Sequence, residues 1–207
     1  THATASREFL LPNAFNAKHT KMLKDAVNIP VFIGHNIFSP EDAEKMLAEG
    51  NADFVALGRS QLAEPAWAKK AKEGRASDIK PCINCLIGCI DRGMLSHTPI
   101  HCTVNPSLYR FECKPVEKAE TRKQVAVVGA GPAGCEAALT ASKRGHQVTI
   151  YEKRCIGGAM IEASKPENKA NIKRLIHYYE DHIMHDPNIT LVKEEVEYET
   201  LVHSGYD

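Results

Sequence analysis

Hydrophobic and polar positions follow one another along the chain in a pattern that predicts alternating strands and helices. Short apolar runs at 31–34 and 53–57 are typical of buried strands. Amphipathic stretches between and around them predict helices over 16–27, 39–49 and 64–73. Because the connections between these elements are short, the pattern indicates a parallel sheet with helical crossovers.

The same alternation restarts after a polar, charged stretch at 114–123. It predicts strands over 124–128, 147–151 and 189–193, and helices over 132–143 and 168–184. Between the two α/β regions, residues 76–113 are loop-rich. We therefore expect four parts, namely 1–75, the segment 76–113, a linker over 114–123, and 124–207.

Composition narrows the classes of partner. The 207 residues include 26 Lys and Arg against 26 Asp and Glu, so the net charge is zero and offers no basic field for nucleic acid or anionic membrane. No apolar run approaches the ~20 residues of a membrane span. The chain does not open with a basic and then apolar signal peptide, which favours a cytoplasmic protein. Because it starts without Met and ends just after a strand-like run, we expect a piece of a longer polypeptide.

Four of the seven cysteines are clustered, as Cys82, Cys85, Cys89 and Cys102. Such clustering favours metal ligation in a reducing compartment over a disulfide scaffold. Four thiolates can hold zinc or an iron–sulfur cluster. Structural zinc usually uses two close Cys-x2-Cys pairs, whereas here three thiols share one loop and the fourth is remote. The spacing therefore favours [4Fe–4S], with zinc and free structural thiols as alternatives.

The strongest local motif lies at 129–134, where Gly-x-Gly-x-x-Gly follows an apolar strand and opens a helix. Gly129 permits the tight turn, Gly131 lets the backbone approach a pyrophosphate, and Gly134 lets the helix pack on the strand. Glu152 follows about twenty residues on, at the end of the next strand, where an acid binds ribose hydroxyls. The motif predicts a dinucleotide site; the alternative is a glycine-rich turn in an unliganded α/β domain.

A weaker signal comes from the loops that follow the strands ending at Gly34 and Gly58. In a (β/α)8 barrel, the loops after the last two strands often bind phosphate. The alternative is a pair of ordinary turn glycines. We expect Trp67 and Cys135 to be packing residues, and Cys113 and Cys155 to be bystanders.

The order of these motifs resembles the flavin/iron–sulfur branch of the old yellow enzyme family. That branch includes 2,4-dienoyl-CoA reductase, enoate reductases and trimethylamine dehydrogenase, which are NADH:flavin oxidoreductase-like enzymes. The resemblance covers nearly the whole chain and is carried by the segments 39–44, 52–59, 62–67, 80–89, 102–106 and 129–134. It departs from the family where many relatives have a double glycine and this chain has His35-Asn36, and in the last cysteine gap, which is twelve residues long.

The resemblance implies the C-terminal part of an FMN-binding TIM barrel over 1–75, a [4Fe–4S] segment over 76–113, and the start of a Rossmann-like domain that binds FAD or ADP over 124–207. It implies FMN phosphate contacts at His35, Asn36, Ile37, Gly58 and Arg59. The implied contacts in the second domain are Gly129, Gly131, Ala133, Gly134, Glu152, Gly158 and Val196. The resemblance places His2 at the histidine of a Tyr/His proton-donating pair whose tyrosine would lie upstream of residue 1. The loop after His2 differs in length from the family's and an accompanying Arg is absent, so an ordinary loop histidine is the alternative.

The function implied by the resemblance is NAD(P)H-dependent reduction of an activated C=C bond in an enoate, enone or dienoyl-CoA. Electrons would pass from NAD(P)H to FAD, to [4Fe–4S], to FMN and to a small-molecule substrate. Amine dehydrogenation is the alternative enzymatic reading, and a non-enzymatic electron-transfer module is the alternative outside enzymes. The family also allows a homo-oligomer.

Overall fold

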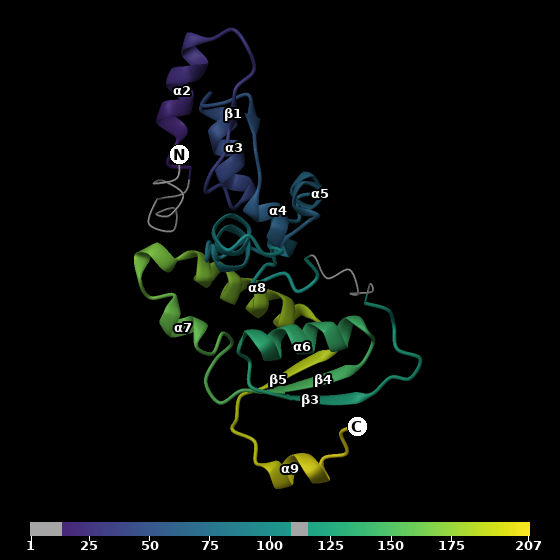
Figure 1. The fold of residues 1–207 in the computed structure, drawn as a ribbon. Helices are drawn as coiled ribbons and strands as arrows, with labels where there is room; N and C mark the ends of the chain where they lie inside the picture. Colours follow the sequence, from purple (N-terminus) through teal and green to yellow (C-terminus); the bar gives the residue numbers. More distant parts are fainter. Residues whose placement is uncertain (1–13, 109–115) are drawn as a thin grey trace. The chain divides into compact units, whose positions relative to one another are not determined.

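The computed structural model describes residues 14–108 and 116–207. The chain divides into two compact units (Figure 1). The first comprises Thr1–Arg110 with Pro166–Asn171, and the second comprises Phe111–Lys165 with Ile172–Asp207. The predicted histidine His2 and the bystander Cys113 lie outside the described residues.

The first unit alternates helices with two short parallel strands. Its elements are α2 (Ala17–Ala26), β1 (Phe32–Ile33), α3 (Pro40–Ala48), β2 (Phe54–Val55), α4 (Arg59–Ala63), α5 (Trp67–Lys72), the 3-10 turn η2 (Ala76–Asp78) and the helical segment η3 (Ile87–Leu95). Phe32 pairs with Phe54 and Ile33 with Val55. The start of α3 is fixed locally, because the Ser39 hydroxyl accepts a hydrogen bond from Asp42 N–H at 3.1 Å.

The core of this unit lies between the two strands and the helices that connect them. Ile33, Met46 and Trp67 are buried there. Trp67 is 5% exposed, which agrees with its prediction as a packing residue. The same core also contains Ala14, Ile37, Ala43, Ala52 and Ile79. This packing fixes the ends of β1 and β2, from which the loops at 34–38 and 56–60 leave.

Two helical elements of this unit were not predicted. α4 has only five residues and ends before Pro65, so it is too short to show a hydrophobic period. η3 lies inside the segment expected to be loop-rich. It is a π-helix, in which each N–H bonds to the carbonyl oxygen five positions earlier, as from Asp91 N–H to Leu86 O at 3.0 Å. It packs closely against the irregular segment that follows, since a Cβ at Gly88 would meet the carbonyl oxygen of His101 at 2.4 Å.

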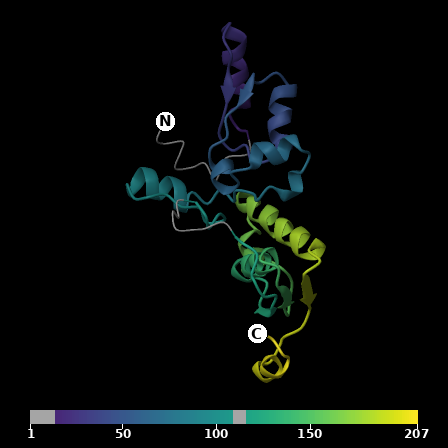
Figure 2. The same cartoon turned by 90° about the vertical axis from the view of Figure 1, so that its right-hand side faces the viewer.

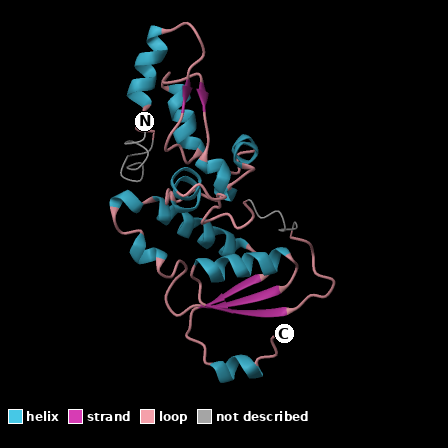
Figure 3. Ribbon diagram, in the orientation of Figure 1, coloured by secondary structure: helices cyan, strands magenta, loops and turns pink. Residues whose placement is uncertain are grey.

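The second unit contains a three-stranded parallel sheet (Figure 3), whose strands lie in the order β3-β4-β5 (Figure 1). Its elements are β3 (Gln124–Val128), α6 (Pro132–Lys143), β4 (Gln147–Tyr151), α7 (Met160–Ala163), the turn η4 (Glu167–Lys169), α8 (Asn171–His185), β5 (Ile189–Val192) and α9 (Tyr198–His203). Helices α6 and α8 lie on the same face of the sheet (Figures 1 and 2). This placement follows from right-handed crossovers that step in one direction across the sheet.

The predicted limits of β3, α6 and β4 agree with the structure, and α8 and β5 differ by a few residues at their ends. The short helices α7 and α9 were not predicted. Val148, Ile150 and Tyr179 are among the buried side chains between sheet and helices. The mixed α/β class is thereby confirmed. Within the described residues, none of the helices combines the length and the apolar character that crossing a membrane requires.

Candidate cofactor-binding sites

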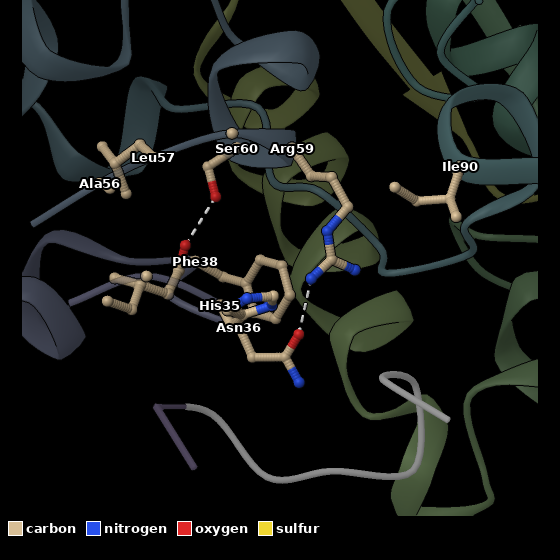
Figure 4. A pocket seen from close by; sticks show the side chains of 11 residues that line it. His35, Asn36, Phe38, Ala56, Leu57, Arg59, Ser60 and Ile90 are labelled. Carbon is tan, nitrogen blue, oxygen red and sulfur yellow. Dashed lines mark hydrogen bonds between the residues drawn. The ribbon is translucent and has the colours of Figure 1, made fainter. Parts of the chain in front are cut away.

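The loops that follow β1 and β2 enclose a cavity of about 420 Å³ in the first unit (Figure 4). All five residues predicted to contact a flavin phosphate line this cavity, namely His35, Asn36, Ile37, Gly58 and Arg59. The carboxyl ends of two parallel strands meet at one edge of the sheet, which explains why the loops at 34–38 and 56–60, although separate in sequence, come together. The structure places these residues around one space, and their contact with FMN stays a prediction.

The first loop has an unusual backbone. His35 and Asn36 have φ of 68° and 51°, in the left-handed region that favours glycine. Two glycines, which the family resemblance leads us to expect at these positions, would adopt this conformation without strain. Two hydrogen bonds join this loop, which follows β1, to the loop that follows β2. The Ser60 hydroxyl donates to Ile37 O at 2.7 Å, and Arg59 Nη2 donates to Asn36 Oδ1 at 2.7 Å (Figure 4).

Arg59 also borders a second cavity. Its Nη1 donates to Asn84 Oδ1, and its guanidinium lies 5.6 Å from the centroid of the Phe38 ring. Asn84 is 5% exposed and was not singled out from the sequence. The available signal was its position between Cys82 and Cys85, where the chain must turn tightly.

The second cavity is lined by all four clustered cysteines, Cys82, Cys85, Cys89 and Cys102. None of them forms a disulfide. Burial raises the pKa of the Cys82 thiol to about 12, although Asn84 N–H donates to its sulfur at 3.4 Å. Burial likewise raises the pKa of Cys89. Four cysteines that are distant in sequence by up to twenty residues therefore share one largely apolar space with Arg59 at its border.

Among the described residues, no three His, Cys, Asp or Glu side chains are arranged to hold a metal ion. Tetrahedral zinc requires four sulfurs about 2.3 Å from a single centre. A four-iron cluster binds each thiolate through a different iron, so its ligands surround a larger volume. Four thiols around one cavity are a donor set that either group could use, so the choice of a cluster over zinc stays a prediction.

The glycine motif of the second unit contains glycines that are required for different reasons. Gly129 has φ of 92°, and a Cβ at Gly134 would lie 1.9 Å from Gly129 O, so both positions need glycine for the turn itself. Gly131 has an extended backbone that any residue adopts, and a Cβ there would meet nothing within 4 Å. The protein alone does not require glycine at 131. The open space above it fits the approach of a pyrophosphate.

Glu152 is tied to the same turn. Its carboxylate accepts hydrogen bonds from Ala130 N–H at 2.8 Å and from Arg154 N–H at 2.7 Å. Burial raises the pKa of Glu152, but these two hydrogen bonds, together with the positive charges of Arg154 and Lys153, outweigh burial and hold the pKa below its ordinary value. Each carboxylate oxygen has a second lone pair, so the group can still accept from a ribose hydroxyl.

The other residues predicted to contact the dinucleotide in this unit differ in how close they lie to the glycine turn at 129–134 and in their exposure. Ala133 is exposed on the first turn of α6. Gly158 lies against the motif, because a Cβ there would be 3.0 Å from Gly131 Cα. Val196 is half-buried in the loop after β5. Cys135 is buried, as expected of a packing residue, and its thiol donates to Ala130 O at 3.3 Å.

Comparison with family models assigns the two ends of the chain to two redox families. Residues 5–78 match NADH:flavin oxidoreductase / NADH oxidase, and residues 123–204 match pyridine nucleotide-disulphide oxidoreductase. The cysteine cavity lies mainly between the two matched regions. The matches support flavin and NAD(P)H as cofactors of the family.

Relatives of known activity agree with these matches. An NADH oxidase of Thermoanaerobacter brockii is 50% identical over 153 residues, which are 73% of this chain and 24% of the relative. The structure of 2-naphthoyl-CoA reductase in complex with 2-naphthoyl-CoA has a TM-score of 0.88 and 31% identity, covering 93% of this chain and 30% of that one. Histamine dehydrogenase from Rhizobium sp. 4-9 has a TM-score of 0.87 and 25% identity, covering 97% and 30%. More distant relatives include both reductases and amine dehydrogenases. The chain spans about a quarter of the length of the curated relatives it matches.

Proposed function

Because the chain belongs to the NADH:flavin oxidoreductase / NADH oxidase family, we propose that it is part of a flavin and iron–sulfur enzyme that uses NAD(P)H to reduce an activated C=C bond. The observation that carries this proposal is that the four cysteines line one cavity, and that Arg59 borders both this cavity and the first one. We call the loops at 34–38 and 56–60, which line the first cavity, the phosphate cradle. A substrate class of enoates, enones and unsaturated acyl thioesters is the one that the resemblance favours.

Each group has residues in the chain that would hold it. The loops at 34–38 and 56–60 would bind the FMN phosphate, and the four cysteines would bind [4Fe–4S]. The turn at 129–134 with Glu152 would bind the pyrophosphate and ribose of FAD or ADP. When bound, the flavins and the cluster would supply hydride and single-electron transfer between NAD(P)H and the double bond.

The chain's own residues contribute binding and orientation. Arg59 places a permanent positive charge at the border of the cradle, where an anionic phosphate would be attracted. Gly131 keeps the backbone open to a diphosphate, and the partial positive end of α6 lies behind it. Glu152 orients the same turn through its two hydrogen bonds from the backbone. A histidine at position 2 as part of the acid machinery is a prediction outside the described residues.

The proposal extends to the domain organisation. We assign 1–75 to the end of a TIM barrel, 76–113 to the cluster segment, 114–123 to a linker, and 124–207 to the start of a Rossmann-like domain. The strand order of the second unit supports the last assignment, since it reproduces one half of a doubly wound sheet.

Amine dehydrogenation is the second candidate, and the similarity to histamine dehydrogenase favours it. Reduction ranks first because the reductase structure is 31% identical to the chain and the dehydrogenase 25%. A module that only transfers electrons would share the cofactors but turn over neither substrate class.

The full-length protein, purified without oxygen, tests these alternatives. NADH and NADPH would be supplied with cinnamate-type acids, enones and dienoyl-CoA, and methylamines would be supplied with an artificial electron acceptor. We expect NAD(P)H consumption that depends on the unsaturated substrate. Amine oxidation without alkene reduction would favour the second candidate, and turnover of neither class would favour the electron-transfer module.

A further inference from the structure

We propose that Asn84 is a positioning residue that couples the cysteine cavity to the phosphate cradle through Arg59, so that a cluster in one site strengthens FMN binding in the other. This inference rests on the proposed function, because it concerns the two groups assigned there. It adds a residue that neither the motif spacing nor the similarity to relatives assigns to a role.

Asn84 contacts both sites through different atoms. Its backbone N–H donates to Cys82 Sγ at 3.4 Å, and its side-chain oxygen accepts from Arg59 Nη1. The residue lies within the short loop from Cys82 to Cys85 and is 5% exposed. A movement of this cysteine loop therefore displaces the oxygen that orients the guanidinium.

Arg59 in turn transmits the position of Asn84 to the cradle. Its second nitrogen, Nη2, donates to Asn36 Oδ1 at 2.7 Å, and Asn36 is 2% exposed. A guanidinium is a planar fork, so hydrogen bonds from two of its nitrogens fix its plane as well as its position. The same side chain borders both cavities.

The expected coupling between the two sites follows from the conformational entropy that is lost when the 82–85 loop and the Arg59 side chain become ordered. A cluster that binds Cys82 and Cys85 fixes the loop between them, including the left-handed backbone of Asn84 at φ of 55°. With the loop fixed, less conformational freedom remains to be lost when Arg59 binds a phosphate. Reciprocity requires that bound FMN strengthens cluster retention by the same factor.

The backbone of Asn84 determines which substitutions are informative. Glycine tolerates a positive φ and removes the oxygen acceptor, so Asn84→Gly breaks the contact to Arg59 without straining the loop. Aspartate also tolerates this region and keeps an oxygen at the same position, so Asn84→Asp is the matched control. Arg59→Lys is a second disruption, because one ammonium cannot reproduce the fork that reaches both asparagines.

The test measures FMN affinity of the full-length protein in two forms, with the cluster present and after its anaerobic removal by a chelator. Flavin fluorescence quenching gives the Kd for added FMN, and iron analysis and circular dichroism verify cluster content and folding. In the wild type, we expect cluster removal to raise this Kd about tenfold, within the usual range of coupling between sites. In Asn84→Gly and Arg59→Lys the ratio should fall below about twofold, and in Asn84→Asp it should persist.

The ratio of the Kd for FMN without the cluster to the Kd with it distinguishes coupling from a merely structural role of Asn84. Local damage to the fold would change the Kd of the cluster-containing and the cluster-free protein equally. A wild type that binds neither FMN nor iron would overturn the proposed function together with this inference. A wild type that binds both, but whose Kd does not depend on the cluster, would overturn the inference alone. Retention of the tenfold ratio in Asn84→Gly or in Arg59→Lys would also overturn it.

Discussion

The carboxylate of Glu152 accepts a hydrogen bond from the backbone N–H of Ala130, inside the glycine turn. The acid that the motif assigns to ribose binding therefore also fixes the turn that would hold the pyrophosphate. Gly157 N–H and the Cys135 thiol both donate to Ala130 O, so the peptide groups on both sides of the Ala130 Cα are held by hydrogen bonds. The contact between Glu152 and Ala130 preorganises the turn in which the dinucleotide is predicted to bind.

Replacement of Glu152 by Ala should weaken binding of FAD and ADP. The variant loses charge-assisted hydrogen bonds to ribose, each worth about 1.5–3 kcal/mol, and leaves two backbone N–H groups without their acceptor. We expect at least a tenfold rise in Kd, since about 1.4 kcal/mol corresponds to tenfold. Isothermal titration calorimetry of the flavin-free protein with ADP measures this Kd. Unchanged affinity would place the nucleotide elsewhere.

The pH dependence of this interaction has a definite direction. The pKa of Glu152 is held below its ordinary value of 4.5, so the carboxylate keeps its two backbone contacts at that pH. The stabilisation it provides is complete above the ordinary value and is lost as the pH falls through the lowered one. The amide resonances of Ala130 and Arg154 should therefore titrate with a midpoint below 4.5. A midpoint above that value would contradict the assigned contacts.

Gly131 and Gly134 form a matched pair of substitutions. An added methyl at Gly131 meets nothing in the protein, so Gly131→Ala should leave the melting temperature nearly unchanged while it weakens ADP binding. Gly131→Val should weaken binding more than Glu152→Ala does. By contrast, Gly134→Ala forces a Cβ to within 1.9 Å of Gly129 O and should destabilise the unit directly. Thermal unfolding and ADP titration of each variant separate the two effects.

If Gly131→Ala lowered the melting temperature as much as Gly134→Ala, glycine at 131 would serve packing rather than a ligand. The nucleotide interpretation of the motif would then lose its main structural support.

The cysteines allow a comparable experiment in the first unit. Cys102 lines the cavity, whereas Cys155 is exposed in the second unit and takes no part in it. Cys102→Ser should lower the iron content and speed the loss of visible absorbance in air, because a ligand thiolate is removed. Cys155→Ser should leave both unchanged, and Cys113→Ser should behave in the same way. Equal loss of iron in the Cys102 and Cys155 variants would remove the basis for the ligand set.

Sequence pattern was most informative where local chemistry dictates the backbone. The limits of β3, α6 and β4 could be predicted because apolar runs, Gly131 and Pro132 mark them directly. The short helices α4 and η3 could not, because α4 spans too few residues to show a period and η3 depends on packing between Gly88 and His101.

The same contrast holds for the candidate sites. The loops after β1 and β2 could be singled out because each follows a strand of the predicted parallel sheet, and the family resemblance then pointed to His35 and Arg59 within them. Asn84 could not, because its importance lies in a contact with Arg59 across 25 positions, and no local pattern encodes such a contact. The second role of Glu152 was hidden for the same reason, since its bond to Ala130 joins the ends of two neighbouring strands.

The metal content of the anaerobically purified protein tests most directly the central claim, that the four cysteines hold a cluster within a flavin oxidoreductase. Elemental analysis with a sulfide assay should find about four irons and four acid-labile sulfides per chain, as expected for one cubane held by four thiolates. Stoichiometric zinc, with neither iron nor sulfide, would contradict it.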